Sequence, residues 1–118
     1  MPLKSIEIFE KMEKMLPTHG AAIVAKVGAV YLWEIREKKG EDPTYVTINL
    51  KEGNGKITMG KEGRADATFV MLDADLMKMM GGTLKSQDAF MTGKLKIKGN
   101  MAKAMKFTTD VFPKDAKL

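Results

Sequence analysis

The sequence predicts an α+β fold, in which helices cover one face of a five-stranded, mainly antiparallel sheet. Two observations lead to this prediction. Apolar and polar residues alternate with a period of two in short runs between residues 29 and 98, and turn-forming segments separate these runs. At both ends of the chain, apolar residues instead recur at helical spacing. Helices formed there would bury their apolar stripes on one face of the central sheet.

The N-terminal helix is expected over residues 3–16, with Pro17 ending it. Its apolar stripe consists of Ile8, Phe9, Met12, Met15 and Leu16. Thr18 is expected to cap a second, shorter helix over residues 21–27, although the β-branched residues of this segment would also suit a strand.

Four strands are predicted next, over residues 29–37, 44–50, 56–60 and 65–72. The first strand places Glu34 and Arg36 on the face opposite its apolar residues. The glycines at residues 53 and 55 are a strong turn signal, and residues 38–42 and 61–64 form further turns. Because the connections are short, the four strands are expected to form an antiparallel meander. The residues expected to face inward are Tyr31, Trp33, Ile35, Val46, Ile48, Leu50, Ala67, Phe69 and Met71.

The hydrophobic period changes at Asp73, the predicted N-cap of a helix that reaches Met80 and ends at two glycines. Ser86 is expected to cap a short helix containing residues 89 and 90. A fifth strand over residues 94–98 points its two apolar residues inward and three lysines outward. Asn100 caps a last helix, whose inward stripe consists of Met101, Ala104, Met105, Thr108 and Phe112.

The composition fits one soluble domain over residues 1–118, with 44% apolar and 30% charged residues. Cysteine is absent, which excludes disulfides, thiolate metal sites and cysteine nucleophiles. We expect neither a secretory signal at the N-terminus nor a transmembrane helix, because the apolar runs are too short. The net charge of +5 fits a solvated basic surface, and it equally fits attraction to acidic headgroups, coenzyme A phosphates or nucleic acid.

Catalytic patterns are missing from the sequence. His19 is the only histidine and is expected in a loop, and the two serines lie in no nucleophile-elbow context. Asp73 and Asp75 suit the first turn of a helix, where negative charge is favoured. We therefore expect no catalytic residues, no metal ligands and no cofactor. We also expect no nucleic-acid partner, because aromatic residues do not alternate with the lysines at 94, 96, 98, 103 and 106.

Residues 87–106 carry a family resemblance, with the sequence QDAFMTGKLKIKGNMAKAMK. This run resembles the C-terminal signature of the sterol carrier protein 2 family. Residues 46–51 with the following turn, residues 65–68 with Met71 and Asp73, and the positions of Ile8, Phe9 and Met12 also resemble that family. Two departures stand out: Ser86 precedes Gln87 where the family often has Asn-Pro or Asp-Pro, and Lys103 replaces a residue that is often apolar.

The resemblance implies an apolar tunnel between the sheet and the helices. It also implies non-enzymatic binding and transfer of fatty acids, fatty acyl-coenzyme A, sterols and phospholipids. Peroxisomal location is a further implication, with the cytoplasm as a second site. The ending Ala116, Lys117 and Leu118 is similar to a peroxisomal targeting tripeptide, so a peroxisomal import receptor is an expected partner.

The chain has 11 methionines, and these flexible side chains suit either gap-filling in an ordinary core or an adaptable lipid-binding surface. The resemblance favours the second interpretation. The candidate lipid-binding residues are Phe9, Met12, Trp33, Ile35, Ile48, Leu76, Met80, Gln87, Phe90, Leu95, Ile97, Met101 and Met105.

Two further interpretations concern partners. An alternative to lipid binding is a peroxisomal scaffold domain that has a solid core and binds only protein. The lysines at 94, 96 and 98, beside Lys103 and Lys106, predict transient docking on an acidic membrane surface. These lysines could instead serve only to keep the open face of the sheet soluble.

Overall fold

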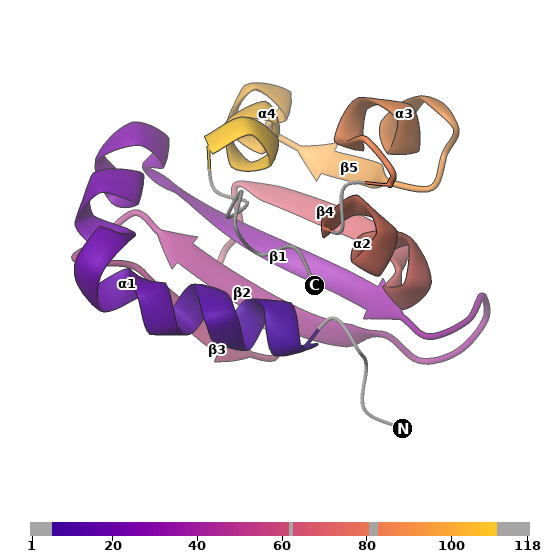
Figure 1. Cartoon of the computed structure of the whole chain (residues 1–118), viewed down its shortest axis with the longest axis horizontal. Helices are drawn as coiled ribbons and strands as arrows, with labels where there is room; N and C mark the ends of the chain where they lie inside the picture. Colours follow the sequence, from indigo (N-terminus) through magenta and orange to yellow (C-terminus); the bar gives the residue numbers. More distant parts are fainter. Residues whose placement is uncertain (1–5, 62, 81–82, 111–118) are drawn as a thin grey trace.

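The computed structural model describes residues 6–61, 63–80 and 83–110, with side chains for all of these except Ile8, Met80, Ser86 and residues 106–110. Figure 1 shows a five-stranded sheet with helices on one side. The strands lie in the order β3-β2-β1-β4-β5. In chain order, the elements are α1 (Ile6–Val27), β1 (Ala29–Arg36), β2 (Thr44–Leu50), β3 (Lys56–Met59), β4 (Ala67–Leu72), α2 (Asp73–Met80), α3 (Ser86–Met91), β5 (Lys96–Gly99) and α4 (Met101–Asp110).

The predicted fold class is confirmed, because three of the four strand pairs are antiparallel and helices cover one face. The predicted four-strand meander is wrong. Strand β4 does not pair with β3 but lies on the other side of β1, parallel to it. The connection between β3 and β4 crosses the open face of the sheet, where Arg64 and Ala65 lie near Leu32 and Thr47. Local turn signals cannot reveal such a crossing.

Helix α1 continues through Pro17, so the prediction that this proline ends a helix is wrong. Pro17 is exposed, where water can bond to the carbonyl that loses its partner, and α1 bends along its length (Figure 1). The predicted cap at Thr18 is also wrong, because its hydroxyl donates a 3.1 Å hydrogen bond back to the carbonyl of Met15. His19 therefore lies on a helix and not in a loop, and its side chain is exposed.

A close approach at Gly20 fixes α1 against the turn between β2 and β3. A Cβ atom at this position would lie 1.8 Å from the carbonyl oxygen of Asn54, so only glycine allows this packing. Leu16, one turn earlier, is buried. The two halves of α1 on either side of Pro17 are thus both held against the sheet.

Helices α2 and α3 follow the predicted ranges, but the capping residue of α3 differs. Lys85 occupies the N-cap position with extended backbone and makes no side-chain capping bond, so the predicted cap at Ser86 is wrong. Strand β5 begins at Lys96 and not at residue 94, because the amide of Leu95 bonds to the carbonyl of Ala89 at 2.9 Å. The predicted cap of the last helix is confirmed, since Asn100 Oδ1 accepts a 3.1 Å hydrogen bond from the amide of Lys103.

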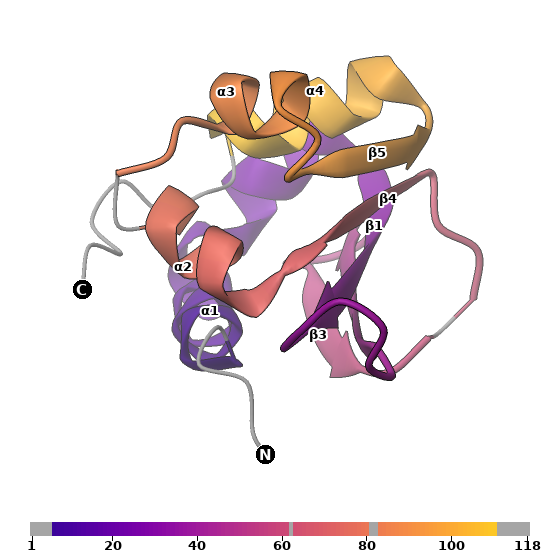
Figure 2. The same ribbon diagram turned by 90° about the vertical axis from the view of Figure 1, so that its right-hand side faces the viewer.

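The core lies between the sheet and the helices (Figure 2). Alternate residues of β1 are buried, from Ala29 to Ile35, and β4 repeats this pattern from Ala67 to Met71. The other face of the sheet carries no helix (Figures 1 and 2). Within the described ranges, no helix combines the length and the apolar character needed to cross a membrane.

Candidate apolar binding site

The helix-covered face of the sheet presents a continuous apolar surface. Pairing places Trp33 between Val46 and Phe69, and Phe69 beside Ile97. Because paired residues point to the same face of a sheet, one face consists of apolar, aromatic and glycine residues, apart from the half-buried Thr44 opposite Ile35. These strand residues are Ala29, Tyr31, Trp33, Ile35, Val46, Ile48, Leu50, Ile57, Met59, Ala67, Phe69, Met71, Ile97 and Gly99.

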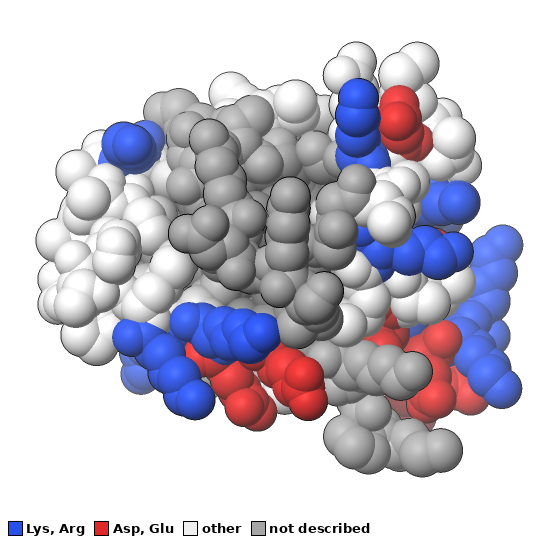
Figure 3. Space-filling model, in the orientation of Figure 1, with Lys and Arg blue, Asp and Glu red and all other residues white. Residues whose placement is uncertain are grey.

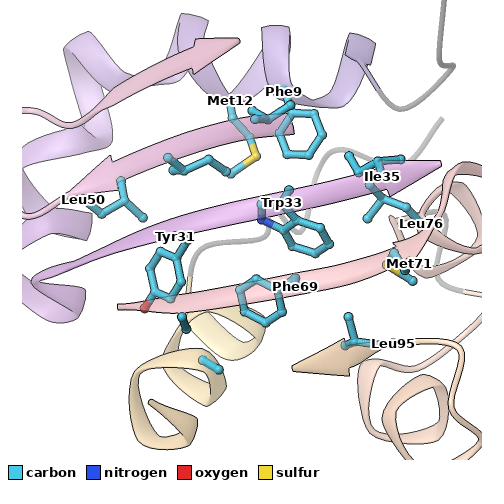
Figure 4. Packing of buried hydrophobic residues seen from close by; sticks show 14 of the residues in the cluster. Phe9, Met12, Tyr31, Trp33, Ile35, Leu50, Phe69, Met71, Leu76 and Leu95 are labelled. Atoms are coloured by element: carbon cyan, nitrogen blue, oxygen red, sulfur yellow. The ribbon is translucent and has the colours of Figure 1, made fainter. Parts of the chain in front are cut away.

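Aromatic rings form the centre of this surface (Figure 4). The rings of Trp33 and Phe69 are stacked with centroids 4.6 Å apart and planes inclined by 22°. Phe9 of α1 meets Trp33 edge-on at 6.0 Å, and Tyr31 lies 5.8 Å from Phe69. Each such pair adds about 0.5–1.5 kcal/mol beyond the area that it buries. The rings therefore form a rigid base against which α1 packs.

Seven of the predicted lipid-binding side chains are buried in one cluster, and Ile97 packs against it half-buried. The seven are Phe9, Met12, Trp33, Ile35, Ile48, Leu76 and Leu95. They come from α1, β1, β2, α2 and the residue before β5, so five separate parts of the sequence meet here. Alternation identified the strand residues and helical spacing identified Phe9 and Met12, and the structure brings them together.

Four of the remaining predicted residues lie at the surface. Phe90, Met101 and Met105 are 44%, 42% and 50% exposed, and Gln87 is also exposed. The prediction that Met101 and Met105 form an inward stripe of α4 is therefore wrong, because Ala104 is the residue of that stripe that is buried. The side chains of Met80 and Thr108, and all of Phe112, lie outside the described residues.

Helix α4 is attached to the rest of the molecule by two polar contacts of Lys103. Its carbonyl accepts a 2.6 Å hydrogen bond from the hydroxyl of Tyr31. Its ammonium lies 3.4 Å from the carbonyl oxygen of Val27, at the C-terminal end of α1, where a cation is favoured. Lys103 is thus half-buried against α1 and does not join the outward row of Lys94, Lys96 and Lys98, contrary to the prediction.

The histidine and carboxylate side chains considered as catalytic candidates lie away from the centre of this apolar surface. His19 lies on the exposed side of α1, with its Nδ1 2.7 Å from the hydroxyl of Thr18. Asp73 and Asp75 occupy the first turn of α2. Among the described residues, no three side chains of the types that bind metal ions lie close enough together to hold one.

The charged side chains on the helix-bearing side are mixed in sign. Figure 3 shows acidic and basic residues side by side over α1, where Glu10, Lys11, Glu13 and Lys14 are all exposed. The basic residues of β5 lie elsewhere, because Lys96 and Lys98 pair with Val70 and Thr68 on the open face of the sheet. Arg36 and Lys39 join Lys94 and Lys96 around one cleft at the end of β1 and β4, a grouping that the sequence pattern does not predict. Only the register across three strands reveals that grouping.

Comparison with known proteins identifies relatives over nearly the whole chain. The model of the SCP-2 sterol transfer family matches residues 9–111. Sterol carrier protein 2 of Arabidopsis thaliana is 42% identical, over 98% of this chain and 96% of the relative. Sterol carrier protein 2 of Gallus gallus is 38% identical over 87% of this chain, which spans only 19% of that relative. Peroxisomal multifunctional enzyme type 2 of Mus musculus is 36% identical over 88% of this chain and 14% of the relative.

Solved structures share the fold. The sterol carrier protein domain 2 of Helicoverpa armigera has a TM-score of 0.76 and 34% identity, over 90% of this chain and 84% of that one. Sterol Carrier Protein-2 from Aedes aegypti, solved in complex with palmitate, has a TM-score of 0.71 and 26% identity, over 94% of this chain and 96% of that one. On the match to the family model and on these likenesses, this chain belongs to the SCP-2 sterol transfer family.

Proposed function

We propose that this protein is a non-enzymatic lipid carrier that holds its ligand in an apolar tunnel between the sheet and the helices. The observation that carries the proposal is the sheet face beneath the helices, where every residue of the described strands except Thr44 is apolar, aromatic or glycine. Burying an acyl chain there would stabilise the complex by about 25 cal/mol for each Å² of apolar surface removed from water. The Aedes aegypti relative in complex with palmitate supports a fatty acid as one ligand.

The proposed ligands are fatty acids, fatty acyl-coenzyme A, sterols and phospholipids. Apolar contacts lack direction, so a surface of this kind discriminates weakly between ligands of similar size. Methionine side chains adapt to different apolar shapes, and Met12, Met71 and Met79 all belong to the buried cluster. The half-exposed Met101 and Met105 of α4 lie where a bound chain could draw them inward. We therefore assign the lining to the residues predicted from the sequence.

Titration with a fluorescent fatty acid tests the proposal. Trp33 is the only tryptophan and lies at the centre of the apolar face, so energy transfer from Trp33 to a bound polyene fatty acid reports an occupied interior. We expect saturable transfer at one equivalent. A folded protein without saturable transfer would favour the alternative, a scaffold domain with a solid core that binds only protein.

We also propose that the protein catalyses no reaction. The histidine of α1 is exposed and the two carboxylates lie in the first turn of α2, an arrangement that offers no nucleophile with an adjacent base among the described residues. Purified protein incubated with acyl-coenzyme A should leave the thioester intact. Hydrolysis that is lost in His19→Gln or Asp73→Asn would contradict this.

Peroxisomal location, with cytoplasmic protein as a second pool, is the last part of the proposal. A relative named as a peroxisomal multifunctional enzyme supports it. The tripeptide Ala116, Lys117 and Leu118, the proposed ligand of an import receptor, lies outside the described residues. Transient docking on acidic membranes is assigned to Lys94, Lys96 and Lys98, all of which are exposed.

A further inference from the structure

A cleft of about 440 Å³ lies at the end of the sheet where β1 and β4 finish. Strand register builds its base: Arg36 pairs with Leu72, and Val70 pairs with both Glu34 and Lys96. These residues point away from the Trp33 and Phe69 rings, because their neighbours in each strand face the helices. The turn after β1, the segment after α3 and the first turn of α2 supply the other walls, through Lys39, Gly40, Thr92, Gly93, Lys94 and Asp75.

The lining of this cleft is basic. Four cationic side chains, Arg36, Lys39, Lys94 and Lys96, face one carboxylate, Asp75. The three lysines are exposed, and within the described part of the chain no ion pair is formed by any of them. Their charges therefore remain available to an anion.

Arg36 is held in place while it lines the cleft. Its Nη1 lies 2.6 Å from Glu34 Oε2, and its Nε donates a 3.0 Å hydrogen bond to the carbonyl of Glu41. Only 28% of its side chain is exposed. The guanidinium thus forms a fixed wall, partly neutralised by Glu34, whereas the three lysines are exposed.

The base of the cleft is apolar, through the side chains of Val70 and Leu72 of β4. Its volume lies within the range of about 300–1,000 Å³ that is typical of small-molecule sites, and exceeds what a lone inorganic ion needs. Lysine ammonium groups bind phosphate as point charges, and an apolar base contacts carbon. A ligand that satisfies both features carries a phosphate group on an organic moiety.

We propose that this basic cleft binds the phosphate group of an organic phosphate, with the ammonium groups of Lys39, Lys94 and Lys96 around the phosphate and the organic part against Val70 and Leu72. The site faces away from the proposed lipid tunnel and does not depend on it. Two sources share this chemistry, a soluble phosphate ester and the headgroup of a phospholipid.

Titration of the ¹⁵N-labelled full chain with phenyl phosphate and with inorganic phosphate, at low ionic strength, tests the proposal. We expect saturable shifts of the amides at residues 39, 40, 93 and 94, with phenyl phosphate binding more tightly because it also contacts the apolar base. The double variant Lys39→Gln/Lys96→Gln should weaken phenyl phosphate binding about tenfold. The control Lys14→Gln/Lys51→Gln, which removes two exposed lysines outside the cleft, should stay within about twofold.

Equal weakening by both double variants, or shifts spread over all lysine-rich surfaces, would overturn the proposal. Vesicles of phosphatidylcholine with and without phosphatidic acid distinguish the source. If only vesicles with phosphatidic acid bind, and only the cleft variant loses them, then the source is a headgroup. If neither soluble probe nor vesicle distinguishes the cleft variant from its control, the site does not exist. Protein loaded with fatty acid should bind phenyl phosphate unchanged, so failure of the lipid-carrier proposal would leave this result intact.

Discussion

The hydroxyl of Tyr31 donates a 2.6 Å hydrogen bond to the carbonyl oxygen of Lys103, joining the central strand to the last helix across 72 residues of sequence. Tyr31 is fully buried on the helix-covered face, so this bond forms away from water. Ala104, the next residue of α4, is buried beside it. The position of α4 over the sheet therefore depends in part on this hydrogen bond and on the burial of Ala104.

Replacing Tyr31 with phenylalanine should destabilise the protein by about 1–2 kcal/mol, because the part-buried hydrogen bond to the Lys103 carbonyl would be lost. Amide hydrogen exchange in α4 should accelerate more than exchange in β2, since α4 loses its attachment. Urea unfolding and hydrogen exchange provide the two measurements. Tyr45→Phe is the matched control, because Tyr45 lies on the open face beneath Lys61 and should lose less than about 0.5 kcal/mol. Equal effects of the two substitutions would contradict this account.

Replacing Gly20 with alanine should destabilise the protein by about 2–4 kcal/mol, although the same change in an ordinary helix stabilises by about 1 kcal/mol. The sign reverses because the new Cβ would lie 1.8 Å from the carbonyl oxygen of Asn54, and backbone must move to accept it. Thermal unfolding measures the effect. Ala21→Gly, one residue along on the exposed side of α1, should cost only about 1 kcal/mol. A stabilised Gly20→Ala variant would show that the turn is not held against α1.

Local signals determined which parts of the fold could be predicted. The predicted ranges of β2 and α2 agree with the structure because alternation, helical period and flanking turns all coincide there. The prediction that Pro17 ends the first helix was wrong because it considered only the local energetic cost of a proline inside a helix. The packing of Leu16 and Gly20, which outweighs this cost, involves strands that are distant in the sequence. The parallel pairing of β1 with β4 could not be predicted either, since it depends on which edge of β1 the chain reaches after β3.

The candidate site was predictable to the same extent. Period-two alternation identified Trp33, Ile35 and Ile48 as inward residues, and all three are buried. The predicted inward stripe of α4 was only partly right. Helical spacing does not determine which residues of an apolar stripe are buried, and Ala104 is buried whereas Met101 is exposed. The cleft around Arg36 and Lys96 could not be seen at all, because these residues meet only through β4.

Lipid transfer to vesicles should depend on charge, whereas fatty-acid binding in solution should not. A lysine near an anionic leaflet contributes about 1 kcal/mol, and salt screens exposed charges over about 8 Å at physiological ionic strength. Transfer to anionic vesicles should therefore be faster than to neutral ones and should slow as salt is added. Lys94→Gln/Lys98→Gln should slow transfer to anionic vesicles more than Lys11→Gln/Lys14→Gln does. If the transfer rate changes neither with salt concentration nor with vesicle charge, these lysines contribute only to solubility.

Removal of Leu118 should leave the protein in the cytoplasm, because an import receptor reads the terminal tripeptide as a unit. Fluorescence microscopy of a fusion with the label at the N-terminus measures location. A Lys117→Arg variant keeps the basic residue and should still be imported. If the truncated protein enters peroxisomes as efficiently as the full chain, then another segment or a partner carries it there.

Replacing Met105 with glutamine should weaken fatty-acid binding about fivefold while leaving unfolding nearly unchanged. Glutamine matches the length of methionine, and the side chain is 50% exposed in the free protein, so little apolar packing is lost on substitution. If residue 105 covers the bound acyl chain as proposed, the side-chain amide of the new glutamine would be removed from water without a hydrogen-bond partner. This would cost about 1 kcal/mol.

Met91→Gln is the matched control, because Met91 is 75% exposed on α3 and is not among the residues proposed to line the tunnel. Its substitution should leave fatty-acid affinity within twofold. The two variants are compared by energy transfer from Trp33 to the bound fluorescent fatty acid. If both substitutions weaken binding equally, the effect is general and α4 does not cover the ligand. If neither changes it, Met105 remains in solvent when lipid is bound, and the lining of the tunnel must be sought closer to the rings of Phe9 and Phe69.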